Sequence, residues 1–198
     1  MSETLSTLAQ RCRHQEDIKK SRFLALAAPV NAAQQALAFL HEVADPAATH
    51  NCWAYRIGQD YRFNDDGEPG GTAGRPILQA IEGQQMDGVV VVVTRWYGGI
   101  KLGAGGLARA YGGTAAECLR RAERVPIIPM ATLALACSFA DLALLKARLP
   151  ELGASVTSET FSGEGANLQL TLPVTRVDEA VSRIADLTRG ETIAARID

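Results

Sequence analysis

The chain has 198 residues, enough for one large domain or two small ones, since a domain usually holds about 100–200 residues. Its composition, 47% hydrophobic and 21% charged, is that of a globular protein and excludes a disordered or fibrous one. The net charge of -2 argues against a protein that holds nucleic acid through a large basic excess, so any anion site must be local.

The chain start lacks the sustained apolar stretch of a signal peptide. The longest apolar run, Val89–Val93, is far shorter than the roughly 20 residues of a membrane-spanning helix. These features predict a cytoplasmic protein with no membrane partner. The cysteines are Cys12, Cys52, Cys118 and Cys137; their wide separation and the lack of a CxxC pair favour reduced thiols over disulfides.

The first part of the chain predicts an alternation of strands and helices. Residues 7–30 predict two strands around a polar turn near Gln15–Asp17. The spacing of apolar residues predicts a helix over residues 31–45, with its apolar stripe at Ala36, Leu37, Leu40 and Val43. Two strands at residues 51–58 and 61–64 precede a loop rich in glycine and proline.

A short helix over Pro76–Glu82 leads to the five consecutive valines, Val89–Val93. Such a uniformly apolar strand is typical of the centre of a sheet that is covered on both faces. A glycine-rich segment, residues 98–106, follows it. The next helix is predicted by apolar and small residues at helical spacing: Leu107, Ala110, Tyr111, Thr114, Ala115, Cys118, Leu119 and Ala122.

Two prolines within residues 124–130 mark a domain junction, so we expect domains at residues 1–126 and 127–198. The second domain predicts the order β-α-β-β-α-β, which is the ferredoxin-like arrangement. The fold class of the whole chain is therefore predicted to be α/β, of the α+β kind.

Local signals refine the second domain. Gly153 is placed to end its first helix, with a distortion of the last turn at Pro150. Thr175 and Asp178 predict a cap at the start of its second helix. Residues 191–197 predict its last strand.

The glycine-rich segment has the parts of an anion site. A strand, a flexible loop and a helix start follow one another, and the unpaired N–H groups and positive dipole of a helix start attract anions. The candidate residues for binding phosphate or nucleic acid are Arg95, Lys101, Gly103, Gly105, Gly106 and Arg109. The alternative interpretation is structural: the glycines, continued by Gly112 and Gly113, let the helix pack closely on the strand.

No standard nucleotide motif supports this site. The Walker pattern is absent because Lys101 precedes the loop, and residues 103–108 only approximate GxGxxG without the acidic residue that completes a dinucleotide fold. His50 and Cys52 form an HxC pair, but no second ligand pair completes a zinc site.

The earlier loop is a candidate for a second side of the same cleft. The residues concerned are Asp65, Asp66, Glu68 and Thr72. Clustered carboxylates can hold Mg²⁺ through water and a bound phosphate, although an Asn-Asp-Asp-Gly run is also typical of a turn that bonds its own backbone. We otherwise expect no cofactor and no metal site.

Several ordered segments resemble the defining motifs of the YigZ/IMPACT family. They are KKSRFLALAAPV (19–30), HNCWAYRIG (50–58), DDGEPGGTAGRPIL (65–78) and VVTRWYGGIKLGAGGLARAYGGTAAE (92–117). The resemblance covers about residues 17–122, and the remaining chain resembles the small C-terminal domain of the bacterial members. TRWYGG departs from the more usual TRYFGG or TRYWGG by exchanging aromatic residues.

The resemblance implies a ribosomal-protein-S5-domain-2-like fold for the first domain and a ferredoxin-like fold, similar to an elongation-factor domain, for the second. The resemblance therefore favours a non-enzymatic protein that binds RNA or the ribosome and regulates translation. It also allows a partner that is another protein in translation control. Eukaryotic relatives use a further N-terminal domain, and their mechanism is not carried over. The alternative is an enzyme that acts on a phosphorylated or nucleotide ligand with Mg²⁺.

Overall fold

The structure is a computed structural model that describes residues 5–197. The chain divides into two compact units, of which the first ends at Ile127 and the second begins at Ile128. Each unit combines helices with antiparallel sheet, which confirms the predicted mixed α/β class. Within the described residues, no helix has the length and hydropathy needed to cross a membrane.

A five-stranded antiparallel sheet organises the first unit, in the order β2-β3-β6-β4-β5. Its strands are β2 (Cys12–Ile18), β3 (Ser21–Pro29), β4 (His50–Ile57), β5 (Asp60–Asn64) and β6 (Val89–Trp96). The valine strand β6 is central and buried on both faces, as its composition predicted. Val89, Val91 and Val93 enter one core, and Val90 and Val92 enter the other.

The turn between β2 and β3 lies at Lys19 and Lys20, so the turn predicted near Gln15–Asp17 is wrong. Residues 15–17 continue β2, which is an edge strand of the sheet. Its side chains alternate between half-buried and exposed positions, and this exposure explains the polar composition that suggested a turn.

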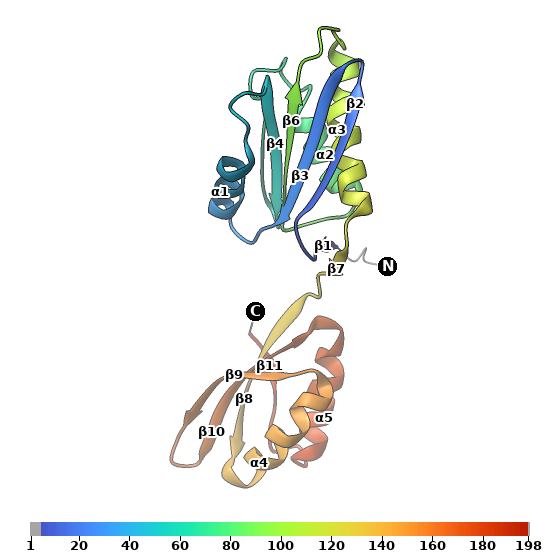
Figure 1. Cartoon of the computed structure of the whole chain (residues 1–198). Helices are drawn as coiled ribbons and strands as arrows, with labels where there is room; N and C mark the ends of the chain where they lie inside the picture. Colours follow the sequence, from blue (N-terminus) through green and yellow to red (C-terminus); the bar gives the residue numbers. More distant parts are fainter. Residues whose placement is uncertain (1–4, 198) are drawn as a thin grey trace. The chain divides into compact units, whose positions relative to one another are not determined.

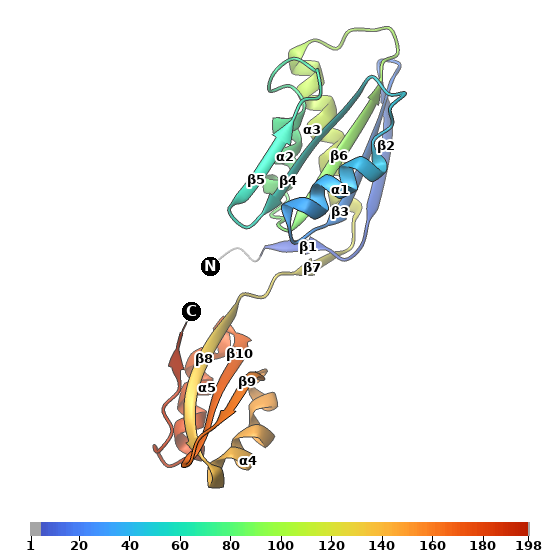
Figure 2. The ribbon, with the colours of Figure 1, turned by 90° about the vertical axis from the view of Figure 1, so that its left-hand side faces the viewer.

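Helices cover both faces of this sheet (Figures 1 and 2). They are α1 (Ala33–Val43), α2 (Gly74–Gly83) and α3 (Ala104–Arg121). Helix α1 lies on one face and buries Ala36 and Phe39, while Leu40 and Val43 are partly buried. Sequence spacing missed Phe39 and placed Leu37 in the stripe instead, because it located the stripe a little too far around the helix.

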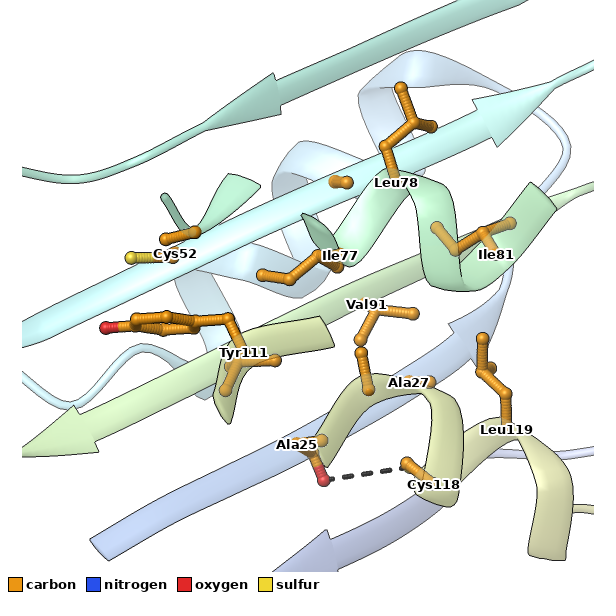
Figure 3. Close-up of a cluster of buried hydrophobic side chains, with 14 of the residues drawn as sticks. Ala25, Ala27, Cys52, Ile77, Leu78, Ile81, Val91, Tyr111, Cys118 and Leu119 are labelled. Atoms are coloured by element: carbon orange, nitrogen blue, oxygen red, sulfur yellow. Dashed lines mark hydrogen bonds between the residues drawn. The ribbon is translucent and has the colours of Figure 1, made fainter. Parts of the chain in front are cut away.

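Helices α2 and α3 cover the other face and share its core. Figure 3 shows Ile77 and Ile81 of α2 and Leu119 of α3 meeting Val91 of the central strand. Helix α2 begins at Gly74, two residues before the predicted start. Helix α3 buries seven of its eight predicted side chains, and the eighth, Ala122, follows the end of the helix and packs partly buried against the same core.

A small two-stranded sheet closes the first unit. Strand β1 (Ser6–Leu8) pairs antiparallel with β7 (Arg124–Pro126). Two backbone hydrogen bonds extend this pairing, from Ala9 N to Glu123 O and from Ile127 N to Leu5 O. The two ends of the unit are therefore held side by side.

The second unit has a four-stranded antiparallel sheet in the order β11-β8-β10-β9. Its elements are β8 (Met130–Ser138), α4 (Phe139–Arg148), β9 (Ser155–Phe161), β10 (Gly165–Pro173), α5 (Val177–Leu187) and β11 (Ala195–Arg196). Both helices contribute to the core on one face of the sheet (Figure 1). The β-α-β-β-α-β order and this strand order agree with the expected ferredoxin-like arrangement.

The helix ends of the second unit agree only in part with the sequence signals. A 3-10 turn, Leu149–Leu152, follows α4, and Gly153 ends it with a φ of 70°, as predicted. The cap predicted at Thr175 is wrong, because Thr175 belongs to a 3-10 turn and Arg176 precedes α5 without a side-chain cap.

The last strand is shorter than residues 191–197, which corrects that prediction. Only Ala195–Arg196 pair with β8. Thr192 instead donates its backbone N–H to the Thr188 hydroxyl at 3.1 Å, so this segment is attached to the end of α5 before it reaches the sheet.

Candidate functional site

A cavity of 370 Å³ in the first unit is lined by both glycine-rich loops. The loop after β5 contributes Glu68 and Pro69, and the segment after β6 contributes residues 101–104. Arg95 at the end of β6 and His50 at the start of β4 complete the polar lining. These two residues are register partners on neighbouring strands, which brings the two loops to the same end of the sheet.

Arg95 and Glu68 form a buried ion pair inside this cavity. Arg95 Nη1 donates to Glu68 Oε1 at 2.6 Å, and the two side chains are 6% and 3% exposed. The Tyr111 hydroxyl donates to the same oxygen at 2.8 Å. A buried charge is costly unless it is paired and hydrogen-bonded, and this arrangement meets both conditions and leaves the pair electrically neutral.

The Arg95 guanidinium also contacts two aromatic rings, with its Cζ 5.5 Å from the centroid of Phe23 and 5.4 Å from that of Tyr97. Its Nε is buried and has no hydrogen-bond partner among the described residues. Buried donors are nearly always satisfied in folded proteins, so this unpaired N–H group is an unusual feature of the Arg95 side chain.

Asp65 holds the first loop to the start of α2. Its Oδ1 accepts from the backbone N–H groups of Ala73 and Gly74 at 3.0 and 2.8 Å, and its Oδ2 accepts from Gly71 N–H at 2.8 Å. These N–H groups would otherwise be unsatisfied at a helix start. Asp65 therefore acts as a cap for a helix that begins nine residues later.

The neighbouring residues of this loop are also engaged locally. Asp66 Oδ2 accepts from the backbone N–H of Asn51 at 2.6 Å, and the Thr72 hydroxyl donates to Pro69 O at 2.6 Å. Of the four residues suggested as the second side of the cleft, only Glu68 lines the cavity. The other three hold the loop in shape.

The start of α3 is open to solvent beside the cavity. Gly103 precedes it with a φ of 73°, which an L side chain rarely adopts, and provides no side-chain cap. The first intrahelical bond of the ladder joins Leu107 N to Gly103 O, so the N–H groups of Ala104, Gly105 and Gly106 have no acceptor within the helix. No acidic residue lies in the first turn.

Lys101 and Arg109 provide positive charge at this helix start. Both residues are exposed, and Arg109 Nη1 lies 3.8 Å from the position that a Cβ on Gly105 would take. The Arg109 side chain therefore folds back along the first turn of α3. Together with the helix dipole, these two cations make the surface attractive to an anion.

The packing interpretation of the glycines applies at some positions and not at others. A Cβ on Gly112 would contact Pro76 of α2 at 3.4 Å, so this glycine does allow a close approach of two helices. A Cβ on Gly103 or Gly113 would meet no described atom within 4 Å. At the helix start the glycines differ: Gly103 has open space around it, whereas a Cβ on Gly106 would lie only 3.1 Å from Leu102 Cβ, so the packing interpretation also applies at Gly106.

His50 and Tyr111 belong to the site although sequence reasoning gave them no role there. His50 Nδ1 lies 2.6 Å from Asp66 O, and its Nε2 lies 3.8 Å from Glu68 Oε1. The HxC pair of His50 and Cys52 was not expected to form a zinc site, and the Cys52 thiol donates to Asp65 O at 3.0 Å. Their proximity depends on the pairing of β4 with β6, and no local pattern in the sequence reveals it.

Two ionisable side chains in this core, Cys52 and Tyr111, have raised pKa values. Burial raises the pKa of the Cys52 thiol to about 12, and burial together with the neighbouring Cys52 raises the pKa of Tyr111 above its ordinary value. Figure 3 shows both side chains within the core of the first unit. The Tyr111 hydroxyl thus remains a donor to Glu68 at neutral pH.

The first unit has two glycine-rich loops around a buried arginine–glutamate pair, and the second unit has the order β-α-β-β-α-β. The class of protein follows from the known domains that each unit matches. The Impact N-terminal domain matches residues 19–119, and a domain of unknown function (DUF1949) matches residues 135–191. The chain therefore belongs to the IMPACT family.

Individual relatives agree with this assignment over most of the chain. An IMPACT family member of Thermus thermophilus, described by its position in the pol 5' region, is 48% identical and covers 87% of this chain and 96% of its own. The IMPACT family member YigZ of Escherichia coli (strain K12) is 36% identical, covering 88% and 89%. A solved crystal structure of a hypothetical protein is 33% identical with a TM-score of 0.75, covering 100% and 99%.

Proposed function

We propose that this protein is a non-enzymatic, cytoplasmic factor that associates with RNA or the ribosome in translation, and that it binds RNA phosphate at the start of α3. The observation that carries the proposal is the exposed, uncapped helix start with Lys101 and Arg109 beside it. Backbone N–H groups and nearby cations are the usual means by which proteins hold nucleic-acid phosphates.

The charge distribution supports a local contact rather than a broad basic surface. The chain carries a net charge of -2, so its overall field does not attract RNA. The first turn of α3 has no acidic residue. Within residues 5–197, Lys101 and Arg109 form no ion pair, whereas Arg120 and Arg121 at the other end of the helix both pair with Glu117.

Arg95 takes a different part in this proposal from Lys101 and Arg109. Its charge is balanced by Glu68, and its side chain is buried. We assign it to the wall of the cavity, where it fixes the position of the first loop. The exposed cations then make the phosphate contacts.

The connection to translation rests on the family. The resemblance of the first domain to a ribosomal-protein fold and of the second to an elongation-factor domain favours RNA or ribosome association over other anionic partners. Membership of the family is also consistent with a protein partner in translation control. Binding to such a partner would persist after nuclease treatment, whereas binding through RNA would not.

Fluorescence anisotropy with a labelled single-stranded RNA tests the phosphate site. We expect the Lys101→Ala, Arg109→Ala double variant to bind about tenfold more weakly and to reduce the salt dependence by about two phosphate contacts. The matched control is Arg120→Ala, Arg121→Ala, which removes the same charge from the other end of α3 and should bind as the wild type does. Equal binding by the two double variants would contradict the assignment.

A second candidate function is an enzyme acting on a phosphorylated or nucleotide ligand with Mg²⁺. The observation that favours it is the cavity beside the helix start, where His50 Nε2 and Glu68 face each other at 3.8 Å. Thermal unfolding with nucleotides, with and without Mg²⁺, separates the two functions, because a ligand of the native state raises its melting temperature. A shift that requires Mg²⁺, with product formed from the nucleotide, would favour the enzyme.

A further inference from the structure

The cavity beside the phosphate site has apolar walls. Pro69, Tyr97, Leu102 and Leu107 line it together with the buried polar pair. Its volume of 370 Å³ is within the range of about 300–1,000 Å³ that is usual for small-ligand pockets. A phosphate group alone needs no such space, so the cavity suits a larger and partly apolar group.

Inside the cavity, the Arg95 guanidinium can donate hydrogen bonds, while its positive charge is balanced by Glu68. Arg95 lines the cavity and directs Nη1 to Glu68 and Nη2 to the Ser21 hydroxyl at 3.4 Å; its Nε is enclosed by the protein, so the donors that remain for a ligand are the second N–H groups of Nη1 and Nη2. A guanidinium has five N–H donors, so several remain unused. Because Glu68 already balances the charge, a neutral acceptor such as a carbonyl oxygen suits this position better than a second anion.

The rim has the opposite character. Lys101 and the start of α3 line the cavity where it opens to solvent, and Gly103 keeps the space above the first turn clear. Tyr97, which is 46% exposed, lies on the same lining. An anion is therefore favoured outside, and a flat apolar group with a carbonyl is favoured inside, next to an aromatic ring.

We propose that the cavity receives one unpaired, carbonyl-bearing nucleobase, such as uracil, while the phosphate of the same nucleotide lies on the start of α3. This inference rests on the proposed RNA binding and specifies its ligand as single-stranded. Base stacking on an aromatic ring is how proteins commonly hold single-stranded RNA, and a duplex keeps its bases out of reach of such a pocket.

Anisotropy titrations with a short oligouridylate, an oligoadenylate and a duplex of the same length test the proposal on the full chain. We expect the oligouridylate to bind about tenfold more tightly than either competitor. Against the duplex the difference is the accessible stacked base, and against the oligoadenylate it is the hydrogen bond to the base carbonyl, since adenine can also stack. Adenine has no carbonyl group, and the duplex offers no free base. Equal affinity for all three RNAs would overturn the inference.

A cavity-filling variant gives an independent check. Leu102→Trp places a larger side chain in the wall without changing any charge, and it should remove the preference for oligouridylate while phosphate-dependent binding remains. Leu144→Trp, at an exposed position of α4 in the second unit, is the control and should keep the preference. If circular dichroism shows that Leu102→Trp does not fold, the exposed Tyr97→Ala replaces it, with the same loss expected. A preference retained in the folded variant would overturn the inference.

Free ligands separate this inference from the proposed function. Uridine monophosphate should compete with the oligouridylate, and inorganic phosphate should compete far less; equal competition by phosphate would overturn the base pocket. If no RNA binds but uridine monophosphate does, the pocket stands and the RNA function fails. If RNA binds without any base preference, the RNA function stands and the pocket fails.

Discussion

Arg95 and Glu68 lie 27 residues apart in the chain, yet their ion pair of 2.6 Å joins the two glycine-rich loops within the first unit. Glu68 comes from the loop before α2, and Arg95 comes from the end of β6 just before the loop that starts α3. The position of one loop relative to the other therefore depends on a contact that is almost completely shielded from water.

Glu68→Gln should strongly destabilise the first unit, because it leaves Arg95 as an unpaired buried charge. The expected loss in the free energy of unfolding is about 3–5 kcal/mol. Urea unfolding followed by tryptophan fluorescence measures it, since the only two tryptophans, Trp53 and Trp96, are both in this unit. Glu117→Gln is the control; it removes two ion pairs on the surface of α3, with Arg120 and Arg121, and should change stability little.

Asp65→Ala should cost about 2 kcal/mol, because two backbone N–H groups at the start of α2 and that of Gly71 in the preceding loop lose their acceptor. Asp66→Ala removes the acceptor of a single N–H group and should cost clearly less. Both are measured by urea unfolding as above. An equal loss in the two neighbours would show that the cap is not what Asp65 contributes.

Gly105→Ala and Gly113→Ala separate the packing and binding interpretations of the glycines. Gly113 lies in the body of α3 with open space around it, so alanine there should stabilise the unit by about 0.5–1 kcal/mol and leave RNA affinity unchanged. Alanine at position 105 should also be tolerated in the fold, since its Cβ would lie 3.8 Å from the flexible end of the Arg109 side chain.

The expected difference between these two variants is in binding. The methyl group of Gly105→Ala stands where the phosphate approaches, so anisotropy should show weaker RNA binding by about tenfold. Unchanged affinity would move the phosphate site away from the first turn of α3.

The stability of the first unit should fall as the pH rises above about 9. The folded state holds the Cys52 pKa at about 12, against an ordinary value of 9.0, so the thiol is protonated in both states below pH 9. Between these values the unfolded chain loses the proton first, and stability decreases by at most about 1.4 kcal/mol per pH unit. Cys52→Ala should show a smaller decrease, measured by urea unfolding at about pH 8 and 10; parallel curves would contradict the raised pKa.

Sequence patterns predicted the elements whose environment is uniform along their length. The five valines identified the central strand because both of its faces are covered, and the stripe of α3 was found because one side packs on the core throughout. Edge strand β2 was not recognised as continuous, because its exposure to water makes it as polar as a turn.

The sequence predicts the separate segments of the site but not the contacts between them. The glycine-rich helix start has a local signature, and Lys101 and Arg109 could be assigned to it from their spacing. The partnership of Arg95 with Glu68 depends on the register of β4 against β6 and on the cap that Asp65 provides across the loop. Such contacts are tertiary, and no periodicity of either segment encodes them.

The pairing of β1 with β7 makes the first unit a closed ring, since residues 5 and 127 are joined by a backbone hydrogen bond of 2.8 Å. Its ends could therefore be linked covalently and the chain reopened in the exposed turn at Gly58, between β4 and β5, without interrupting a strand of the main sheet. The first unit should therefore tolerate circular permutation, and the chain continues into the second unit directly after β7, where the two ends of the first unit meet.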